Sequence, residues 1–291
     1  MWIQERSPTP AVSPKPSVEA RLRWWVERLA IPRHIVADAR NNRWVRDQLV
    51  AAFRNLGFCV RLQGRYGNVL ALPRTAGGEP LTLVAAHYDS VPGCPGADDN
   101  ASGLAVMLEC AGALASTGAR VGFIAFNAEE ENLAGSRDFV AHGLGSLGNP
   151  VAQVHVLEMV GYHGAGRPAE PLPVPWTPPS ARVPDFIGVL GRGASNAAAH
   201  LAVRSPAAPG LHVLAVKTWG PLHRWFPDLA RSDHFPFWSA GLPAVLWTDT
   251  GNFRNPNYHR PSDTPDTLDY GFMSEVAELL CAVVADGLAI P

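Results

Sequence analysis

A short apolar run near residue 85 ends in side chains that can bind a metal ion. The run LTLVAA, residues 81–86, is typical of a strand that is buried on both faces. His87 follows it directly, and Asp89 comes two residues later. The adjacent pair Asp98 and Asp99 closes the same loop. Because imidazole and carboxylate groups are common ligands of zinc, the pattern favours a metal site at the carboxyl end of this strand.

Further candidate ligands follow other predicted strands. Glu129 and Glu130 leave the apolar run VGFIAF, Glu158 ends the run VAQVHVL, and His259 lies in the loop after PAVLWTD. In a doubly wound sheet the reactive crevice lies outside the carboxyl ends of the strands, so we expect these side chains to converge. Taken singly, a histidine or an acidic pair is more often a solvated loop residue or a helix cap. Two histidines together with three or four carboxylates favour a metal centre.

The elements that must position these residues alternate between apolar strands and helices. We predict a single α/β domain from residue 17 to residue 291, with a doubly wound, mixed β-sheet and helices on both faces. The expected strands are 57–63, 67–73, 81–86, 121–126, 151–158, 185–191, 212–217 and 243–249. The expected helices are 17–30, 41–57, 101–116, 131–143, 193–203 and 272–288. The first two strands are expected to pair beside the strand at 81–86.

Two proline-rich segments do not fit this alternation. Residues 1–16 are predicted to be a disordered arm, because proline-rich polar sequence cannot bury enough surface to become ordered. The segment from about 164 to 184 holds seven prolines and little periodicity. It is predicted to be a surface excursion within the domain, because the alternation resumes after it.

Composition restricts the partners. A net charge of -2 argues against nucleic acid as a partner. No run of 18 apolar residues occurs, so we expect no membrane span. The first 16 residues lack the apolar core of a signal peptide, and we therefore expect a cytoplasmic protein. The sequence does not specify an oligomeric state.

Several motifs in a fixed order resemble one family. They are AHYDS, PGADDNASG, AEEENLAGS, LEMVGY, RSDHFPFWSAGLPAVLWTD and NPNYHRPSDTPDTLD. The chain from about Ser17 onward resembles the co-catalytic di-zinc aminopeptidases, which include bacterial leucyl aminopeptidase and whose relatives include the glutaminyl cyclases. Six motifs in the family's order are far more specific than any one of them. The resemblance implies a zinc-dependent exopeptidase fold and a peptide or small aminoacyl substrate.

The resemblance also implies a centre of two Zn²⁺ ions with five ligands. His87 and Glu158 would hold one ion, and Glu130 and His259 would hold the other. Asp98 would bridge the two ions. Other divalent metals would fit the same ligand set.

Further roles around the centre follow from the same resemblance. Glu129 would be the general base that takes a proton from the attacking water. Asp89 would hold the neighbouring imidazole in one tautomer. Asp233, His234 and Tyr258 would line the substrate side, with a helix cap as an equally weighted interpretation of Asp233.

Two positions depart from the family pattern. Many members carry aspartate where this chain has Glu158, so the geometry around one ion is expected to differ. Asn132 replaces a glycine after the paired glutamates. Because asparagine tolerates a positive φ better than most residues, we expect the turn to be kept.

Other classes of protein would require features that differ from those of an aminopeptidase. A glutaminyl-peptide cyclase would use one zinc and is expected to carry tryptophan where this chain has Tyr258. A two-domain metallocarboxypeptidase would need an inserted domain between Glu158 and His259. A serine hydrolase would need a G-x-S-x-G elbow, which the chain lacks. An inactive binding relative would have lost a ligand or the base, and none is missing.

Overall fold

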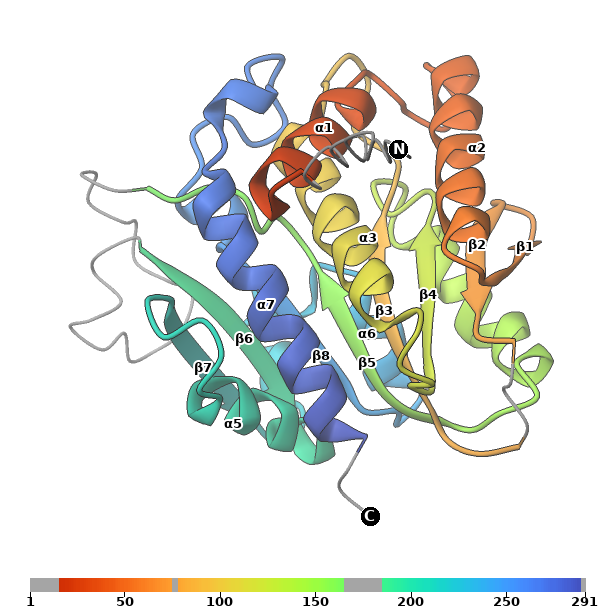
Figure 1. Cartoon of the computed structure of the whole chain (residues 1–291), viewed down its shortest axis with the longest axis vertical. Helices are drawn as coiled ribbons and strands as arrows, with labels where there is room; N and C mark the ends of the chain where they lie inside the picture. The colour runs from red at the N-terminus through yellow and green to blue at the C-terminus, as the bar shows by residue number, and fades with distance from the viewer. Residues whose placement is uncertain (1–15, 75–77, 165–184, 289–291) are drawn as a thin grey trace, which may run out of the picture.

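Eight strands of the described chain form one mixed sheet in the order β1-β2-β4-β3-β5-β8-β6-β7 (Figure 1). The computed structural model describes residues 16–74, 78–164 and 185–288. The strands are β1 Cys59–Gln63, β2 Asn68–Leu72, β3 Leu81–His87, β4 Val121–Phe126, β5 Val151–Leu157, β6 Phe186–Arg192, β7 His212–Thr218 and β8 Ala244–Thr248. The α-helices are α1 Val18–Leu29, α2 Ala39–Asn55, α3 Gly103–Leu114, α4 Ala134–Asp138, α5 Asn196–Arg204, α6 His234–Ser239 and α7 Tyr270–Gly287.

The centre of the sheet is parallel and its flanks contain antiparallel pairs. Strand β3 pairs in parallel with β4 on one side and with β5 on the other, and β5 pairs in parallel with β8. The β1–β2 hairpin was expected beside β3, and this prediction is wrong because β2 pairs antiparallel with β4. Both edges of β3 are already taken by parallel partners, so the hairpin extends the sheet beyond β4.

Local sequence accounts for where the first helix begins and which face it buries. The Ser17 hydroxyl accepts a hydrogen bond from the Ala20 amide at 3.2 Å, a cap that contributes about 1 kcal/mol. Leu22, Val26 and Leu29 recur at helical spacing and are completely buried. Helix α1 therefore packs its apolar stripe against α3 and α7.

Helices cover both faces of the sheet, which confirms the predicted doubly wound architecture. One apolar core lies under α1, α2, α3, α5 and α7, and α7 crosses the front of the sheet in Figure 1. A second core on the opposite face includes Phe139 from the turn after α4 and Phe237 from α6. Strand β3 is buried along its whole length because it lies between these two layers.

Some predictions concern residues outside the described part. The predicted arm at 1–16 is described only at Pro16, and the predicted excursion at 164–184 only at Gly164.

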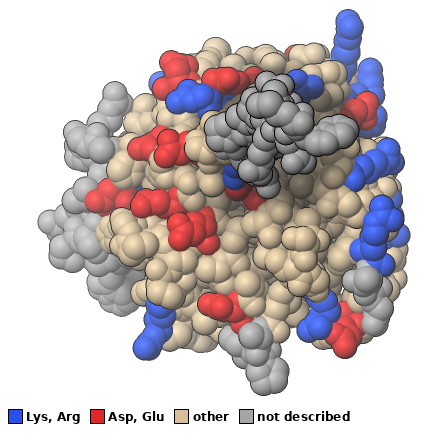
Figure 2. Space-filling model, viewed as in Figure 1, with Lys and Arg blue, Asp and Glu red and all other residues tan. Residues whose placement is uncertain are grey.

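Among the described helices, none has the length and apolar character needed to cross a bilayer. On the face in Figure 2, neither acidic nor basic side chains cover the whole surface.

Candidate metal centre

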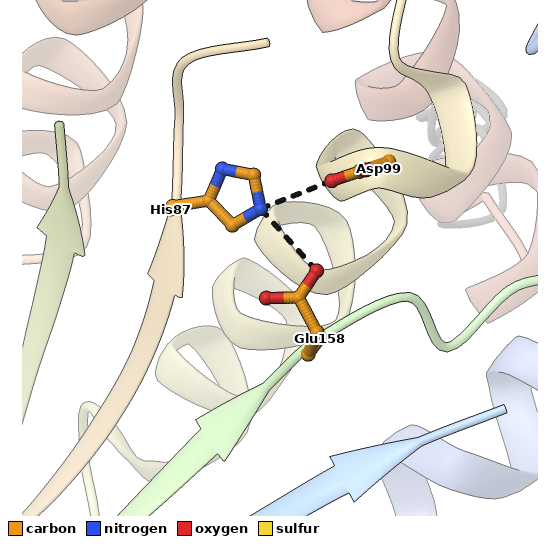
Figure 3. A group of neighbouring side chains, drawn as sticks. All are labelled: His87, Asp99 and Glu158. Atoms are coloured by element: carbon orange, nitrogen blue, oxygen red, sulfur yellow. Dashed lines mark hydrogen bonds and ion pairs between the residues drawn. The ribbon is translucent and has the colours of Figure 1, made fainter. Parts of the chain in front are cut away.

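Three side chains meet at the carboxyl ends of β3 and β5 (Figure 3). His87 is the last residue of β3, Glu158 directly follows β5, and Asp99 lies in the turn before α3. The Nε2 atom of His87 is 3.1 Å from an Asp99 oxygen and 3.4 Å from a Glu158 oxygen. We call His87 and Glu158 the first half-site.

A second group shares the same aspartate. The Nε2 atom of His259 is 3.2 Å from the other Asp99 oxygen and 3.3 Å from a Glu130 oxygen. We call Glu130 and His259 the second half-site. Asp99 therefore offers one carboxylate oxygen to each half-site, which is the arrangement of a bridging ligand.

The structure places the Asp99 carboxylate, not that of Asp98, between the two imidazoles, so the prediction of Asp98 as the bridge is wrong. The Asp98 carboxylate accepts hydrogen bonds from the Gly161 amide at 2.9 Å and from the Asn255 side chain at 2.6 Å. Both of its oxygens are thus engaged behind the centre. Neighbouring side chains in this tight turn point in different directions, and the backbone path decides which of them faces the imidazoles.

Asp89 connects the first histidine to the paired glutamates. Its two carboxylate oxygens accept the backbone amides of Glu129 and Glu130 at 3.1 and 3.2 Å. One of these oxygens also lies 3.4 Å from Nδ1 of His87.

Asn132 lies in the turn after the paired glutamates. Its φ is 65°, so the prediction that asparagine keeps the turn is confirmed.

The electrostatics of the cluster favour cations. Burial, with the nearby Asp99 carboxylate, raises the pKa of Glu130 to about 7. Burial alone would lower the pKa of His259, but its hydrogen bonds to Asp99 and Glu130 raise that pKa to about 10. Burial and the charges of Glu158 and other acids likewise hold the pKa of Glu129 well above its ordinary value, against the effect of the nearby imidazole. These carboxyl groups cannot all ionise together unless positive charge is placed among them.

The interatomic distances fit a shared ion in each half-site. Zinc bonds to nitrogen and oxygen of ~2.0 Å in a tetrahedron place neighbouring ligand atoms about 3.3 Å apart. The four separations between histidine nitrogens and carboxylate oxygens run from 3.1 to 3.4 Å. In addition, Oε1 of Glu130 is buried and has no hydrogen-bond partner in the described part of the chain. The donor set of two imidazoles and three carboxylates therefore suits two divalent ions.

Ser232 is a site residue that the sequence reasoning missed. Its hydroxyl donates a 2.7 Å hydrogen bond to Oε2 of Glu158, which leaves Oε1 facing His87. The longer side chain that replaces aspartate at this position is therefore held by a dedicated partner. The only available signal was its place in the RSDH motif, directly before α6.

Two of the three predicted substrate-side residues are placed elsewhere. Asp233 and His234 are completely buried and do not line the cavity beside the centre. The His234 imidazole lies 3.0 Å from the Leu229 carbonyl oxygen and packs edge-on against Trp238. Asp233 occupies the N-cap position of α6, as the cap interpretation expects, but its side chain makes no capping hydrogen bond there.

A cavity of about 150 Å³ opens beside the candidate metal ligands. Its near end holds Glu129 and the third predicted residue, Tyr258, which stacks on His259 with ring centroids 3.7 Å apart. The guanidinium of Arg231, another residue that sequence reasoning missed, donates to the Tyr258 hydroxyl at 3.1 Å. The far end is apolar and is formed mainly by strand residues, among them Phe186, Gly188, Leu190, Leu214, Val216 and Leu246.

Comparisons with known proteins show which proteins this chain resembles. The model of peptidase family M28 matches residues 68–284. The uncharacterised protein YfbL of Escherichia coli K12 is 35% identical over 230 residues, which cover 74% of this chain and 69% of that protein.

Two solved structures share the fold. BSAP, a zinc aminopeptidase from Bacillus subtilis, is 28% identical with a TM-score of 0.56, and the match covers 75% of this chain but only 49% of that one. The glutaminyl cyclase of Porphyromonas gingivalis is 20% identical with a TM-score of 0.66, covering 92% of this chain and 98% of that one. The motifs, the fold and the match over three quarters of its length agree: the chain belongs to peptidase family M28.

Proposed function

We propose that the chain is a metal-dependent aminopeptidase with a two-zinc centre. The observation that carries the proposal is the position of Asp99, whose two carboxylate oxygens face the imidazoles of His87 and His259. The first half-site would hold one ion and the second half-site the other. The similarity to a zinc aminopeptidase supports zinc as the metal.

Glu129 would carry the proton transfers. Zinc, when bound, would polarise the scissile carbonyl and lower the pKa of a water molecule. Glu129 lines the cavity next to Glu130 but belongs to neither ligand group, so its carboxylate is free to accept the proton of that water. The same carboxyl group would then give the proton to the leaving amine. Burial holds the pKa of Glu129 above its ordinary value, the direction that makes a carboxylate a stronger proton acceptor.

The cavity suggests where the substrate lies. A peptide whose first carbonyl sits at the centre would place its free α-amine among carboxylates, including Glu129 and Glu158. Its first side chain would extend into the apolar far end between β6, β7 and β8. We therefore propose that peptides with an apolar first residue are the substrates, since burial of apolar surface contributes ~25 cal/mol per Å².

A glutaminyl cyclase is the second candidate, because a solved cyclase structure shares the fold of this chain over almost the whole length of both proteins. A cyclase must keep water from the centre so that the substrate amine attacks its own side-chain amide. Mass spectrometry of peptides starting with Leu, Gln and N-acetyl-Leu distinguishes the two. An aminopeptidase releases the first residue from the Leu peptide and leaves the acetylated peptide intact, whereas loss of ammonia from the Gln peptide without cleavage would favour the cyclase.

The role of Glu129 has a matched test in its neighbours. Glu129→Gln should retain two zinc ions and lose ~10²–10⁴-fold in kcat, because it removes the general base. Glu130→Gln should lose zinc. Glu131→Gln is the control, since Glu131 is half exposed and contacts His34 at 2.8 Å, away from the centre. Near wild-type kcat in the Glu129→Gln protein with zinc bound would exclude Glu129 as the base.

A further inference from the structure

The turn that presents Asp99 is held from two sides by buried side chains distant in the sequence. We call residues 95–99 the bridge turn. Arg33, between α1 and α2, reaches it from one side, and Asp263, in the loop after His259, reaches it from the other. Both side chains are completely buried, although neither belongs to the metal-binding groups.

Arg33 engages the carbonyl oxygens of this region. An arginine has five N–H donors. Here they point to five main-chain carbonyl oxygens, those of Ile31, Tyr88, Pro95, Gly96 and Asp99. A buried guanidinium is costly unless its donors are satisfied, and carbonyl oxygens satisfy them without occupying a carboxylate. The Asp99 carboxylate is thus left available for cations.

Asp263 engages the amide groups of the same turn. Its Oδ1 accepts the Asp98 amide at 2.9 Å and its Oδ2 accepts the Asp99 amide at 3.1 Å. Its backbone carbonyl also accepts the Ala97 amide at 3.2 Å. The Arg33 guanidinium therefore binds the carbonyl side of the bridge turn, and the Asp263 carboxyl group binds its amide side.

Gly96 shows how closely the turn fits this arrangement. A Cβ atom at Gly96 would lie 2.1 Å from the Asp99 carbonyl oxygen and 3.0 Å from both terminal nitrogens of Arg33. Its φ of 62° is also a conformation that glycine adopts without strain. The absence of a side chain at this position lets the guanidinium reach the turn.

The two contacts also connect the bridge turn to both half-sites. Arg33 binds the carbonyl of Tyr88, the residue directly after His87, at 2.8 Å. Asp263 lies four residues after His259 in the same loop. We propose that Arg33 and Asp263 are positioning residues that form a clamp on the bridge turn and set the affinity of both ions through Asp99. This inference rests on the proposed two-metal function and assigns a role to two residues outside the ligand set.

Zinc competition with a chromophoric chelator tests the clamp. Asp263→Asn replaces one acceptor by an NH₂ group that would face a backbone amide, and Arg33→Lys keeps the charge but cannot reach five carbonyls. Each variant should bind both ions about 10–100-fold more weakly, the usual effect of losing a residue that orients a metal ligand. Both ions are affected because they share Asp99.

Two matched variants serve as controls. Asp269→Asn alters an aspartate that also accepts a backbone amide, that of Phe272 at 3.0 Å, but at the start of α7. Arg21→Lys alters an arginine of α1 that pairs with Glu109. Neither control should change zinc affinity.

Thermal unfolding with and without zinc separates positioning from general stability. A ligand that binds only the folded state raises Tm according to its affinity. The clamp variants should therefore show a smaller zinc-induced rise in Tm than the wild type and the controls. The clamp proposal would be overturned if the variants had a lower Tm but the same zinc affinity and the same zinc-induced rise in Tm as the wild type. If one of the two variants does not fold, the other variant alone provides the test. A wild type that takes up no zinc would instead overturn the proposed function itself.

Discussion

The two half-sites differ in what holds their ligands. His87 ends a fully buried strand and its side chain has no exposed surface, whereas the His259 side chain is 35% exposed and lies on a loop. His259 also has a φ of 57°, which a non-glycine residue keeps only when its surroundings hold it there. The first half-site therefore lies at the ends of two adjacent strands, and the histidine of the second half-site depends on loop packing. We expect the ion of the second half-site to exchange more readily.

The largest effect should come from removing the residue that both half-sites share. Asp99→Asn replaces the bridging carboxylate by a neutral amide, and elemental analysis should find that both ions are lost or bound too weakly to survive purification. Asp98→Asn is the matched control one residue away, because the Asp98 carboxylate points to Gly161 and Asn255. The assignment of the bridge fails if Asp98→Asn loses both ions while Asp99→Asn keeps them.

Separate removal of the two histidines tests the difference directly. His259→Ala should leave one zinc per chain, because the first half-site and Asp99 remain in place on buried elements. In the wild type, a stepwise chelator titration should release one ion before the other, and the ion kept by His259→Ala should be the one released later. If His259→Ala instead keeps the ion that the wild type releases first, the first half-site holds its ion more weakly than the second, contrary to our expectation.

A smaller effect is expected from Ser232→Ala, which acts on the first half-site alone. Glu158 would lose its 2.7 Å hydrogen bond and with it the constraint on Oε1. Zinc competition should show about a tenfold weaker first ion, the lower end of the range for partners that orient a ligand. Ser239→Ala provides the control, since that hydroxyl donates to the Phe235 carbonyl within α6. Equal affinities in the two variants would mean that Ser232 does not orient Glu158.

The last prediction concerns folding stability, not metal affinity, and the strand that precedes Glu158. Burial lowers the pKa of His155 in β5 to about 3, and its Nδ1 accepts a hydrogen bond from Trp247 at 3.1 Å. As the pH falls below 6.5 the unfolded chain binds a proton that the folded chain does not bind until about pH 3, so folding stability falls across this window. The contribution is at most about 1.4 kcal/mol per pH unit.

Urea unfolding at pH 7 and pH 5 measures the contribution of His155 to the free energy of unfolding. His155→Asn keeps an acceptor for Trp247 without a titrating ring, and its stability should fall less on acidification than that of the wild type. His142→Gln is the control, because His142 is largely exposed on the turn after α4. If His155→Asn loses as much stability between pH 7 and pH 5 as the wild type, protonation of His155 does not cause the loss of stability at low pH.

Much of this architecture could be predicted because the signals are local. The apolar runs before His87, Glu130 and Glu158 are strands, and the cap at Ser17 starts a helix, since both depend on neighbours in the chain. Residues at strand ends converge because parallel strands share an edge, which made the group of His87, Glu130, Glu158 and His259 predictable.

Other features depended on contacts between distant segments. The hairpin of β1 and β2 lies beside β4 because β3 has no free edge, and no local pattern records which edge is occupied. Asp233 and His234 looked like substrate contacts in a motif, yet both are completely buried at the start of α6. The apolar end of the cavity comes from three strands that are far apart in the sequence.

The sequence by itself determined the strands, the main helices, the family and the chemical types of the ligands, because periodicity, caps and motif order are properties of adjacent residues. Only the tertiary structure decided between Asp98 and Asp99. Two identical side chains in succession carry the same chemistry, so no sequence pattern separates them. The choice is made by Gly161 and Asn255, which take the oxygens of Asp98, and by the two imidazoles, which face those of Asp99.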